Sequence, residues 1–104
     1  MAPFVYEFEW DPVKARTNFN KHRLDFSRAA TVFTDPLAVT VPDEEHGETN
    51  WRNPGQVDTM GKDYAGSYVR VVHTFAQLDK DRGRIRLISA RKPTKAEIQN
   101  YEER

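Results

Sequence analysis

The chain has 104 residues, of which 38% are hydrophobic and 12% aromatic, so its composition fits one globular domain over residues 1–104 and excludes a disordered chain. It contains no cysteine, which excludes disulfides and thiolate chemistry, and no signal-like or membrane-spanning stretch, so we expect a cytoplasmic protein without membrane contact. The 16 basic and 16 acidic residues cancel, and net charge alone therefore gives no support to nucleic-acid binding.

The first third of the sequence predicts one strand and two helices. Residues 4–10 alternate aromatic with other side chains, a pattern that is typical of a strand. Asp11 suits the N-cap of a helix with proline at its first position, which we expect to run to about His22. A second helix is expected over residues 25–35, because aspartate precedes apolar residues at helical spacing and proline follows.

The remainder of the sequence is rich in strand signals. Strands are expected at residues 37–41, 67–75 and 84–92, with a weaker candidate at 56–62. The acidic residues 43–55 and the polar residues 76–83 predict loops, and a final helix begins after Pro93, where Thr94 and Glu97 have capping-box spacing. We therefore predict an α+β fold, in which an antiparallel sheet carries two N-terminal helices and one C-terminal helix.

Residues 84–92 form the most unusual of these strands, because cations interrupt its aliphatic residues. Regular alternation would place Arg84, Arg86, Ile88 and Ala90 on one face, and Ile85, Leu87, Ser89 and Arg91 on the other. Neither face is then cleanly apolar, so at least one arginine must lie at the rim of a packed layer. That position is costly unless the arginine is paired with an acid or contacts an anion.

Several kinds of catalytic site receive no support from the sequence. The three histidines lack metal-ligand spacing and there is no cysteine, so we expect no metal and no cofactor. The serines lack a nucleophile-elbow context, and no glycine-rich loop is present to cradle a phosphate. What remains is a basic set, to which an imidazole, His73, and an aromatic residue, Tyr101, can be added. The basic set consists of Lys21, His22, Arg86, Arg91 and Lys92.

Metal-free RNA cleavage needs little more than such a set. One group takes the proton of the 2′-hydroxyl, cations stabilise the phosphorane-like transition state, an acid protonates the leaving 5′-oxygen, and an aromatic ring holds a splayed base. On the residues alone, ordinary surface charge is the better supported interpretation, since basic strands and helix ends are common on proteins that cut nothing.

Two blocks of the sequence carry a resemblance to a known family. They contain Phe8-Glu9-Trp10-Asp11-Pro12, Lys14-Ala15, Asn18, Lys21-His22, Phe26, Ala29-Ala30, Val32-Phe33 and Asp35-Pro36, and then Ile88-Ser89-Ala90-Arg91-Lys92 with Tyr101-Glu102. In this order and at this spacing they resemble the BrnT family, the toxin halves of bacterial BrnT/BrnA type II toxin–antitoxin systems. Arg23 departs from the pattern, because the family usually has Gly after its Lys-His pair.

The resemblance implies a RelE-like ribonuclease fold, RNA cleavage without a metal, and neutralisation by a BrnA-type antitoxin that alone contacts operator DNA. Lys21, His22, Arg91, Lys92 and Tyr101 match family positions, and Arg52 stands near a family arginine. We expect catalytic roles for His22, His73, Arg86, Arg91 and Tyr101, and RNA contacts from Lys21, Lys92 and Arg52.

In this hypothesis the two arginines bind the phosphate and the transition state, one histidine acts as acid or base, and the tyrosine stacks on or orients a base. A second hypothesis is an inactive relative whose basic surface only binds an antitoxin or nucleic acid. A third is a structural domain with no nucleic-acid role.

Overall fold

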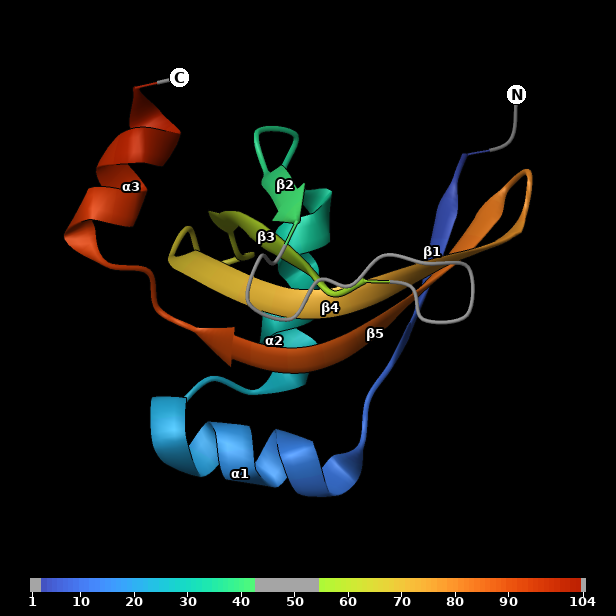
Figure 1. Ribbon diagram of the computed structural model, residues 1–104, viewed down its shortest axis with the longest axis horizontal. Helices are drawn as coiled ribbons and strands as arrows, with labels where there is room; N and C mark the ends of the chain where they lie inside the picture. The colour runs from blue at the N-terminus through green and yellow to red at the C-terminus, as the bar shows by residue number, and fades with distance from the viewer. Residues whose placement is uncertain (1–2, 43–54, 104) are drawn as a thin grey trace.

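The computed structural model describes residues 3–42 and 55–103 (Figure 1). Its strands are β1 (Val5–Glu9), β2 (Val39–Pro42), β3 (Val57–Lys62), β4 (Tyr68–Asp79) and β5 (Arg82–Arg91). Its helices are α1 (Pro12–His22), α2 (Phe26–Ala29), the 3₁₀ helix η1 (Ala30–Thr34) and α3 (Lys95–Glu102). One five-stranded sheet has the order β1-β5-β4-β3-β2, in which β1 is parallel to β5 and the other pairs are antiparallel. The predicted α+β class is confirmed, with β1 added in parallel to the antiparallel meander.

Local capping residues set the helix ends where the sequence predicts them. The carboxylate of Asp11 accepts a hydrogen bond of 2.8 Å from the backbone N–H of Val13 at the start of α1. Asp25 accepts from the N–H of Arg28 at 2.7 Å, and the predicted second helix is built as α2 followed directly by η1. None of the helices in the described ranges is long and apolar enough to span a membrane.

α1 ends at Arg23, whose backbone lies in the left-handed region at φ 58° and ψ 29°. Its N–H donates to the carbonyl of Phe19 at 2.8 Å, which closes the last turn of the helix. Glycine adopts this conformation without the steric cost that a side chain adds. The backbone therefore explains why a glycine suits this position, and Arg23 adopts the same turn at some cost in strain.

The structure overturns one sequence-based prediction about the strands and confirms another. The expected loop at residues 76–83 is wrong, because β4 continues to Asp79 and β5 begins at Arg82, which leaves a two-residue turn. The weak candidate at residues 56–62 is β3, an interior strand. Gly61 lowers its strand propensity but is needed there, since an added Cβ would lie 2.9 Å from Cγ2 of Val32.

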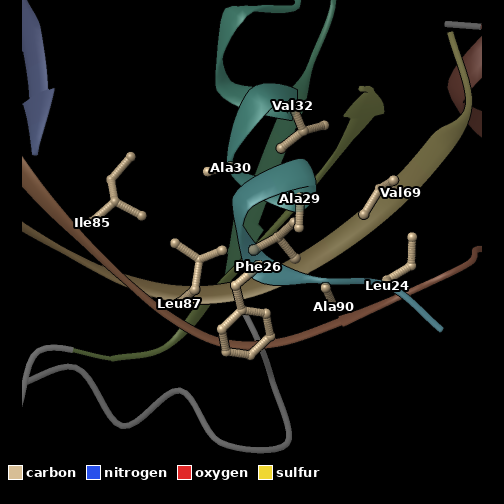
Figure 2. Packing of buried hydrophobic residues seen from close by; sticks show 10 residues of the cluster. Leu24, Phe26, Ala29, Ala30, Val32, Val69, Ile85, Leu87 and Ala90 are labelled. Atoms are coloured by element: carbon tan, nitrogen blue, oxygen red, sulfur yellow. The ribbon is translucent and has the colours of Figure 1, made fainter. Parts of the chain in front are cut away.

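The core lies between one face of the sheet and the helices α2 and η1 (Figure 2). It contains Leu24, Phe26, Ala29, Ala30, Val32, Val69, Val71, Ile85, Leu87 and Ala90. The opposite face of the sheet, which we call the open face, carries Asp58, Met60, Arg70, Ser89 and Arg91 by register and alternation.

A β-bulge at Ile88 resolves the mixed character of β5. Val72 pairs with Ser89 and His73 pairs with Leu87, so Ile88 has no partner across the ladder. The extra residue switches the alternation, and Ile85, Leu87 and Ala90 all reach the core although their spacing is irregular. The arginines of β5 consequently face away from the core.

The side chain of Asn18 fixes α1 to the outer edge of β5. β1 pairs with β5 only as far as Arg86, so the following edge needs another partner. Asn18 supplies it: Nδ2 donates to the carbonyls of Ala90 (2.9 Å) and Leu24 (3.2 Å), and Oδ1 accepts from the N–H of Ala90 at 3.0 Å. α1 therefore lies along the end of β5 (Figure 1).

Replacing Asn18 with alanine is expected to lower the free energy of unfolding by about 3 kcal/mol, because it leaves three buried backbone groups without partners. Urea denaturation followed by circular dichroism measures the change. Asn20→Ala, on the exposed side of the same helix, is the matched control and should change stability by less than about 0.5 kcal/mol. Equal stability of the two variants would contradict the role given to Asn18.

Candidate functional site

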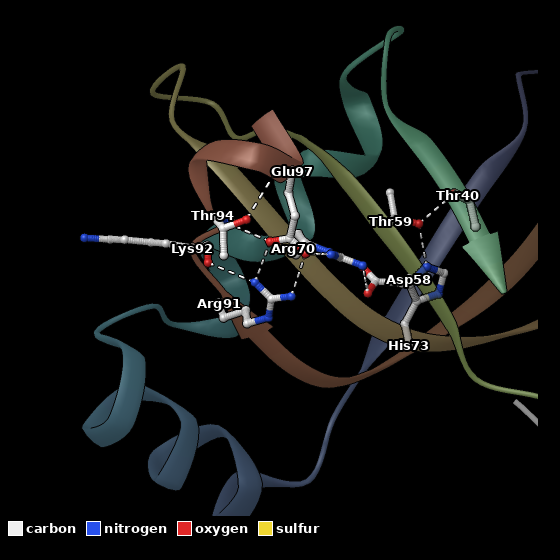
Figure 3. Close-up of polar contacts among 9 residues, drawn as sticks. All are labelled: Thr40, Asp58, Thr59, Arg70, His73, Arg91, Lys92, Thr94 and Glu97. Carbon is white, nitrogen blue, oxygen red and sulfur yellow. Dashed lines mark hydrogen bonds and ion pairs between the residues drawn. The ribbon is translucent and has the colours of Figure 1, made fainter. Parts of the chain in front are cut away.

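Two arginines lie side by side on the open face of the sheet. Arg70 of β4 and Arg91 of β5 are register partners, which would bring two like charges together. Glu97 of α3 lies between them: its Oε1 and Oε2 accept from Nη1 and Nη2 of Arg91 at 2.9 and 3.0 Å, and Oε2 also pairs with Nη1 of Arg70 (Figure 3). Asp58 of β3 accepts from Nε and Nη2 of Arg70. We call these four residues the arginine pair site.

The arginine pair site is partly shielded from water, which strengthens its charge-assisted hydrogen bonds. The exposed fraction of the side chain is 12% for Asp58, 20% for Arg70 and 22% for Glu97. Arg91 is the most open of the four, at 40%. An anion that enters the arginine pair site from solvent therefore meets Arg91 before Arg70, and it competes there with the Glu97 carboxylate.

α3 is held in place by polar side chains at both ends. Glu97 completes a capping box, since its Oε1 accepts from the N–H of Thr94 at 2.8 Å while its own N–H donates to Thr94 Oγ1 at 3.2 Å. At the other end the Tyr101 hydroxyl donates to Asp35 Oδ2 at 3.0 Å. Every residue of α3 stays at least partly exposed, so these contacts rather than a buried face fix the helix.

The partners of α3 have shifted pKa values. Burial acts to raise the pKa of Asp35, but hydrogen bonds from Lys62, Leu37 and Tyr101 outweigh it and the pKa lies below its ordinary value. The Tyr68 hydroxyl donates to Glu102 at 2.6 Å, and this bond raises the pKa of Tyr68 to about 12. Both groups therefore keep the protonation states that hold α3 at neutral pH.

A groove of about 260 Å³ separates α1 from β5. Lys14, Lys21 and His22 line it from α1, and Ser89 lines it from the strand. Among the residues that the structure describes, neither lysine has a carboxylate partner. The groove therefore offers positive charge that no acid neutralises, together with an imidazole that reaches solvent.

A second basic hollow, of about 400 Å³, lies just beyond the C-terminal end of α1 and is lined by Arg23, Arg28 and Lys92. Arg28 is paired with Asp63 at 2.7 Å. Burial acts to raise the pKa of Asp63, but hydrogen bonds from Ser67, Arg28 and Ala65 outweigh this effect. The pKa of Asp63 therefore lies below its ordinary value, and Asp63 stays charged. Lys92 is exposed and has no acidic partner within residues 3–42 and 55–103.

His73 lies on the core face of β4, away from the arginine pair site. Its Nε2 is 2.7 Å from Oγ1 of Thr59 (Figure 3). Its Nδ1 is 3.3 Å from the carbonyl of Thr74, and its ring meets Phe33 edge-on. Burial is the main cause that lowers the pKa of His73, so the ring is neutral at pH 7. The structure thus gives this candidate the contacts of a packed core residue.

The other sequence-predicted residues lie at separate places in the structure. Lys21 and His22 share the α1–β5 groove, whereas Arg86 lies farther along the strand and contacts Glu9 at 3.4 Å. Tyr101 lines the open face next to Arg70. Arg52 lies outside the described residues.

Sequence reasoning missed three members of the arginine pair site: Arg70, Asp58 and Glu97. The sequence shows Arg70 as a cation flanked by two valines, Val69 and Val71, within a predicted strand. Only the β4–β5 register shows that Arg70 neighbours Arg91. Glu97 was recognised for its capping-box spacing, and its second role depends on where α3 packs.

Comparison with known families decides the classification. Residues 10–97 match the family described as "Ribonuclease toxin, BrnT, of type II toxin-antitoxin system". The chain belongs to the BrnT family. Membership in this family implies ribonuclease toxin activity, an RNA substrate and an antitoxin partner.

A solved BrnT structure supports the fold. The 1.1 Å crystal structure of the Brucella abortus ribonuclease toxin BrnT aligns with a TM-score of 0.55 and 18% identity, over 91% of this chain and 100% of that chain. No curated protein sequence matches the chain. At this identity the likeness to the Brucella BrnT concerns the fold, and the family match carries the classification.

The burial of His73 predicts a pH-dependent contribution to stability. Its pKa is lower in the folded than in the unfolded chain, where it is about 6.5, so the unfolded chain takes up a proton first as pH falls. The contribution is complete above about pH 6.5 and is lost progressively below it. Urea denaturation at a series of pH values is expected to show this slope in the native chain and its loss in His73→Gln.

His22→Gln removes an imidazole from the α1–β5 groove instead and is the matched control. The control should keep the slope below about pH 6.5. A slope of the same size in His73→Gln would show that His73 does not titrate as its burial requires.

Proposed function

We propose that this chain is a metal-independent endoribonuclease toxin that acts in the cytoplasm, cleaves RNA and thereby inhibits translation. The proposal places the whole activity in one domain, residues 1–104, and assigns neutralisation to a BrnA-type antitoxin, through which the toxin reaches operator DNA. The observation that carries it is the arginine pair site on the open face, at the same end of β5 as the groove of Lys21 and His22.

The proposed reaction uses side chains alone. Among the described residues, no three His, Asp or Glu side chains are grouped closely enough to hold a metal ion. His22 takes the proton of the 2′-hydroxyl, whose oxygen forms a bond to phosphorus as the bond to the 5′-oxygen breaks. The products are a 2′,3′-cyclic phosphate and a 5′-hydroxyl, with the last proton supplied by water.

Electrostatic stabilisation falls to the arginines. Arg91 donates through two parallel N–H groups, the geometry that matches a phosphate as well as a carboxylate. The scissile phosphate would replace Glu97 as the partner of Arg91. The neighbouring guanidinium of Arg70, which pairs with the same carboxylate, would add a second positive charge. Lys21 and Lys92 contact neighbouring phosphates, and Arg86 extends the same face. Tyr101, which lines the same cavity as Arg70, would orient a base.

One observation favours the alternative of an inactive binding module. Arg70, Arg86 and Arg91 each already have a carboxylate partner in the chain. If RNA does not displace these acids, the open face can hold a partner without cutting RNA. The enzyme would convert RNA into shorter fragments, whereas the binding module would leave RNA intact.

Arg91→Ala is expected to reduce RNA cleavage by about 100-fold or more, the usual effect of removing a donor to a developing oxyanion. Cleavage of a labelled RNA is measured with purified protein in EDTA. Arg91→Lys keeps the charge without the two-pronged geometry and should fall between alanine and the native residue.

The matched control is Arg82→Ala, which removes an arginine of β5 that pairs with Glu7 and Asp79 at the far end of the strand. It should cleave like the native chain. Thermal denaturation of each variant establishes that it is folded. Cleavage by Arg91→Ala at the native rate would refute the role given to Arg91, and loss of native cleavage in EDTA would refute metal independence.

Expression in bacteria separates the enzyme from the binding module. The native chain is expected to arrest growth, and Arg91→Ala produced at the same level is expected to be tolerated. Co-expression of a BrnA-type antitoxin should restore growth to cells that carry the native chain. Harmless accumulation of soluble native protein that binds RNA without cutting it would support the binding module instead.

A further inference from the structure

A cavity of about 280 Å³ lies on the open face between the sheet and α3. Val39 and Val41 of β2 and Met60 of β3 form its apolar floor, and Asn100 and Tyr101 of α3 form its wall. Arg70, Asp58 and Glu97 close one end. We call this cavity the apolar slot. It is distinct from the α1–β5 groove, although the arginine pair site borders it.

We infer that the apolar slot receives one unpaired nucleobase of the RNA, the base next to the phosphate held by Arg91. The inference rests on the proposed function and adds the determinant of base recognition to it. A nucleobase has apolar faces and a polar edge, and proteins recognise single-stranded RNA by holding such bases against aromatic and apolar side chains.

Continuity with the arginine pair site favours a nucleobase over other small ligands. Arg70 lines the slot and shares Glu97 with Arg91, so one carboxylate connects the slot to the phosphate-binding position. A ligand that spans both places needs an anionic group joined to a flat, largely apolar group. One nucleotide of RNA has this composition, with its phosphate on Arg91 and its base in the slot.

The wall of the slot is already fixed in the free protein. The Tyr101 hydroxyl donates to Asp35, and the Tyr101 ring packs edge-on against Tyr68 with centroids 5.4 Å apart. A base that enters the slot therefore meets an aromatic ring that is held in position. Such preorganisation lowers the entropic cost of binding.

The polar groups of the slot indicate how a base edge could be read. Asp58 and Glu97 already accept hydrogen bonds from the two arginines and from the N–H of Thr94. Asn100 is exposed, and its side-chain amide makes no hydrogen bond within the described part of the chain. Its amide both donates and accepts, so it is the group available to distinguish base edges.

The slot can be tested by filling it. Val41 is 45% exposed on the edge strand β2, and Val41→Trp would occupy the slot without disturbing the core. Val5→Trp is the matched control, because Val5 is 49% exposed on β1, the opposite edge strand of the same sheet. A short RNA cut at one mapped bond serves as the probe, beside the same RNA with an abasic ribose on either side of that bond.

With the native chain, one of the two abasic substitutions is expected to lower kcat/KM by about tenfold or more, the effect of losing one base–aromatic contact. Val41→Trp should cut the intact RNA as slowly as the native chain cuts that abasic RNA, with no further loss on the abasic probe. Val5→Trp should behave like the native chain. Asn100→Ala should reduce the differences among the four bases while keeping the abasic penalty.

Failure of the slot and failure of the proposed function give different results. If the native chain cuts the RNA but Val41→Trp keeps the full abasic penalty, the slot does not hold the base. If the native chain cuts no RNA, the proposed function fails, and fluorescence anisotropy with uncleavable 2′-O-methyl RNA makes the same comparison by affinity. Equal affinity of the native chain for intact and abasic strands would then overturn the inference.

Discussion

The amide of Asn18 is the contact on which the arrangement of the basic surface depends. A single side chain supplies both the donor and the acceptor that the edge of β5 would otherwise receive from another strand. It also binds the carbonyl of Leu24, which fixes the turn between α1 and α2. Because the last turn of α1 carries Lys21 and His22, this contact places them beside the end of β5.

Charge pairing explains how a chain of zero net charge keeps a basic surface. The arginines of the sheet are matched by acids from neighbouring elements, as in the pairs Arg82–Glu7 and Arg86–Glu9. The lysines that lie at the ends of α1 and β5 are not matched in this way within the described ranges. A polyanion would therefore meet lysines first and would reach Arg91 only in competition with Glu97.

Features encoded by neighbouring residues could be predicted from the sequence. The N-caps at Asp11 and Thr94 act over three residues or fewer, and both helices begin where their caps predict. Features that depend on tertiary register could not be predicted. The bulge at Ile88 decides which β5 residues are buried, and nothing in the strand itself marks it. The two strands of the β4–β5 hairpin were predicted, but their extension through residues 76–83 was taken for a loop because those residues are mostly polar.

The candidate site shows the same division. Arg91 was identified from the resemblance and from its place in a basic strand, whereas its neighbour Arg70 follows only from the pairing of two strands. His73 was selected as a candidate from the sequence, but the structure places it in the core. Its position in a strand does not indicate the Thr59 hydroxyl that it contacts there. Sequence patterns thus located the surface but could not identify the acids that control it.

The parallel pairing of β1 with β5 has a consequence for how the chain assembles during its own synthesis. β1 and α1 leave the ribosome first, but their partners in β5 lie more than 70 residues later in the chain, as the Asn18–Ala90 separation of 72 shows. Until β5 has emerged, the α1–β5 groove and the arginine pair do not exist. The basic helix α1 is therefore synthesised well before the strand that completes the candidate site.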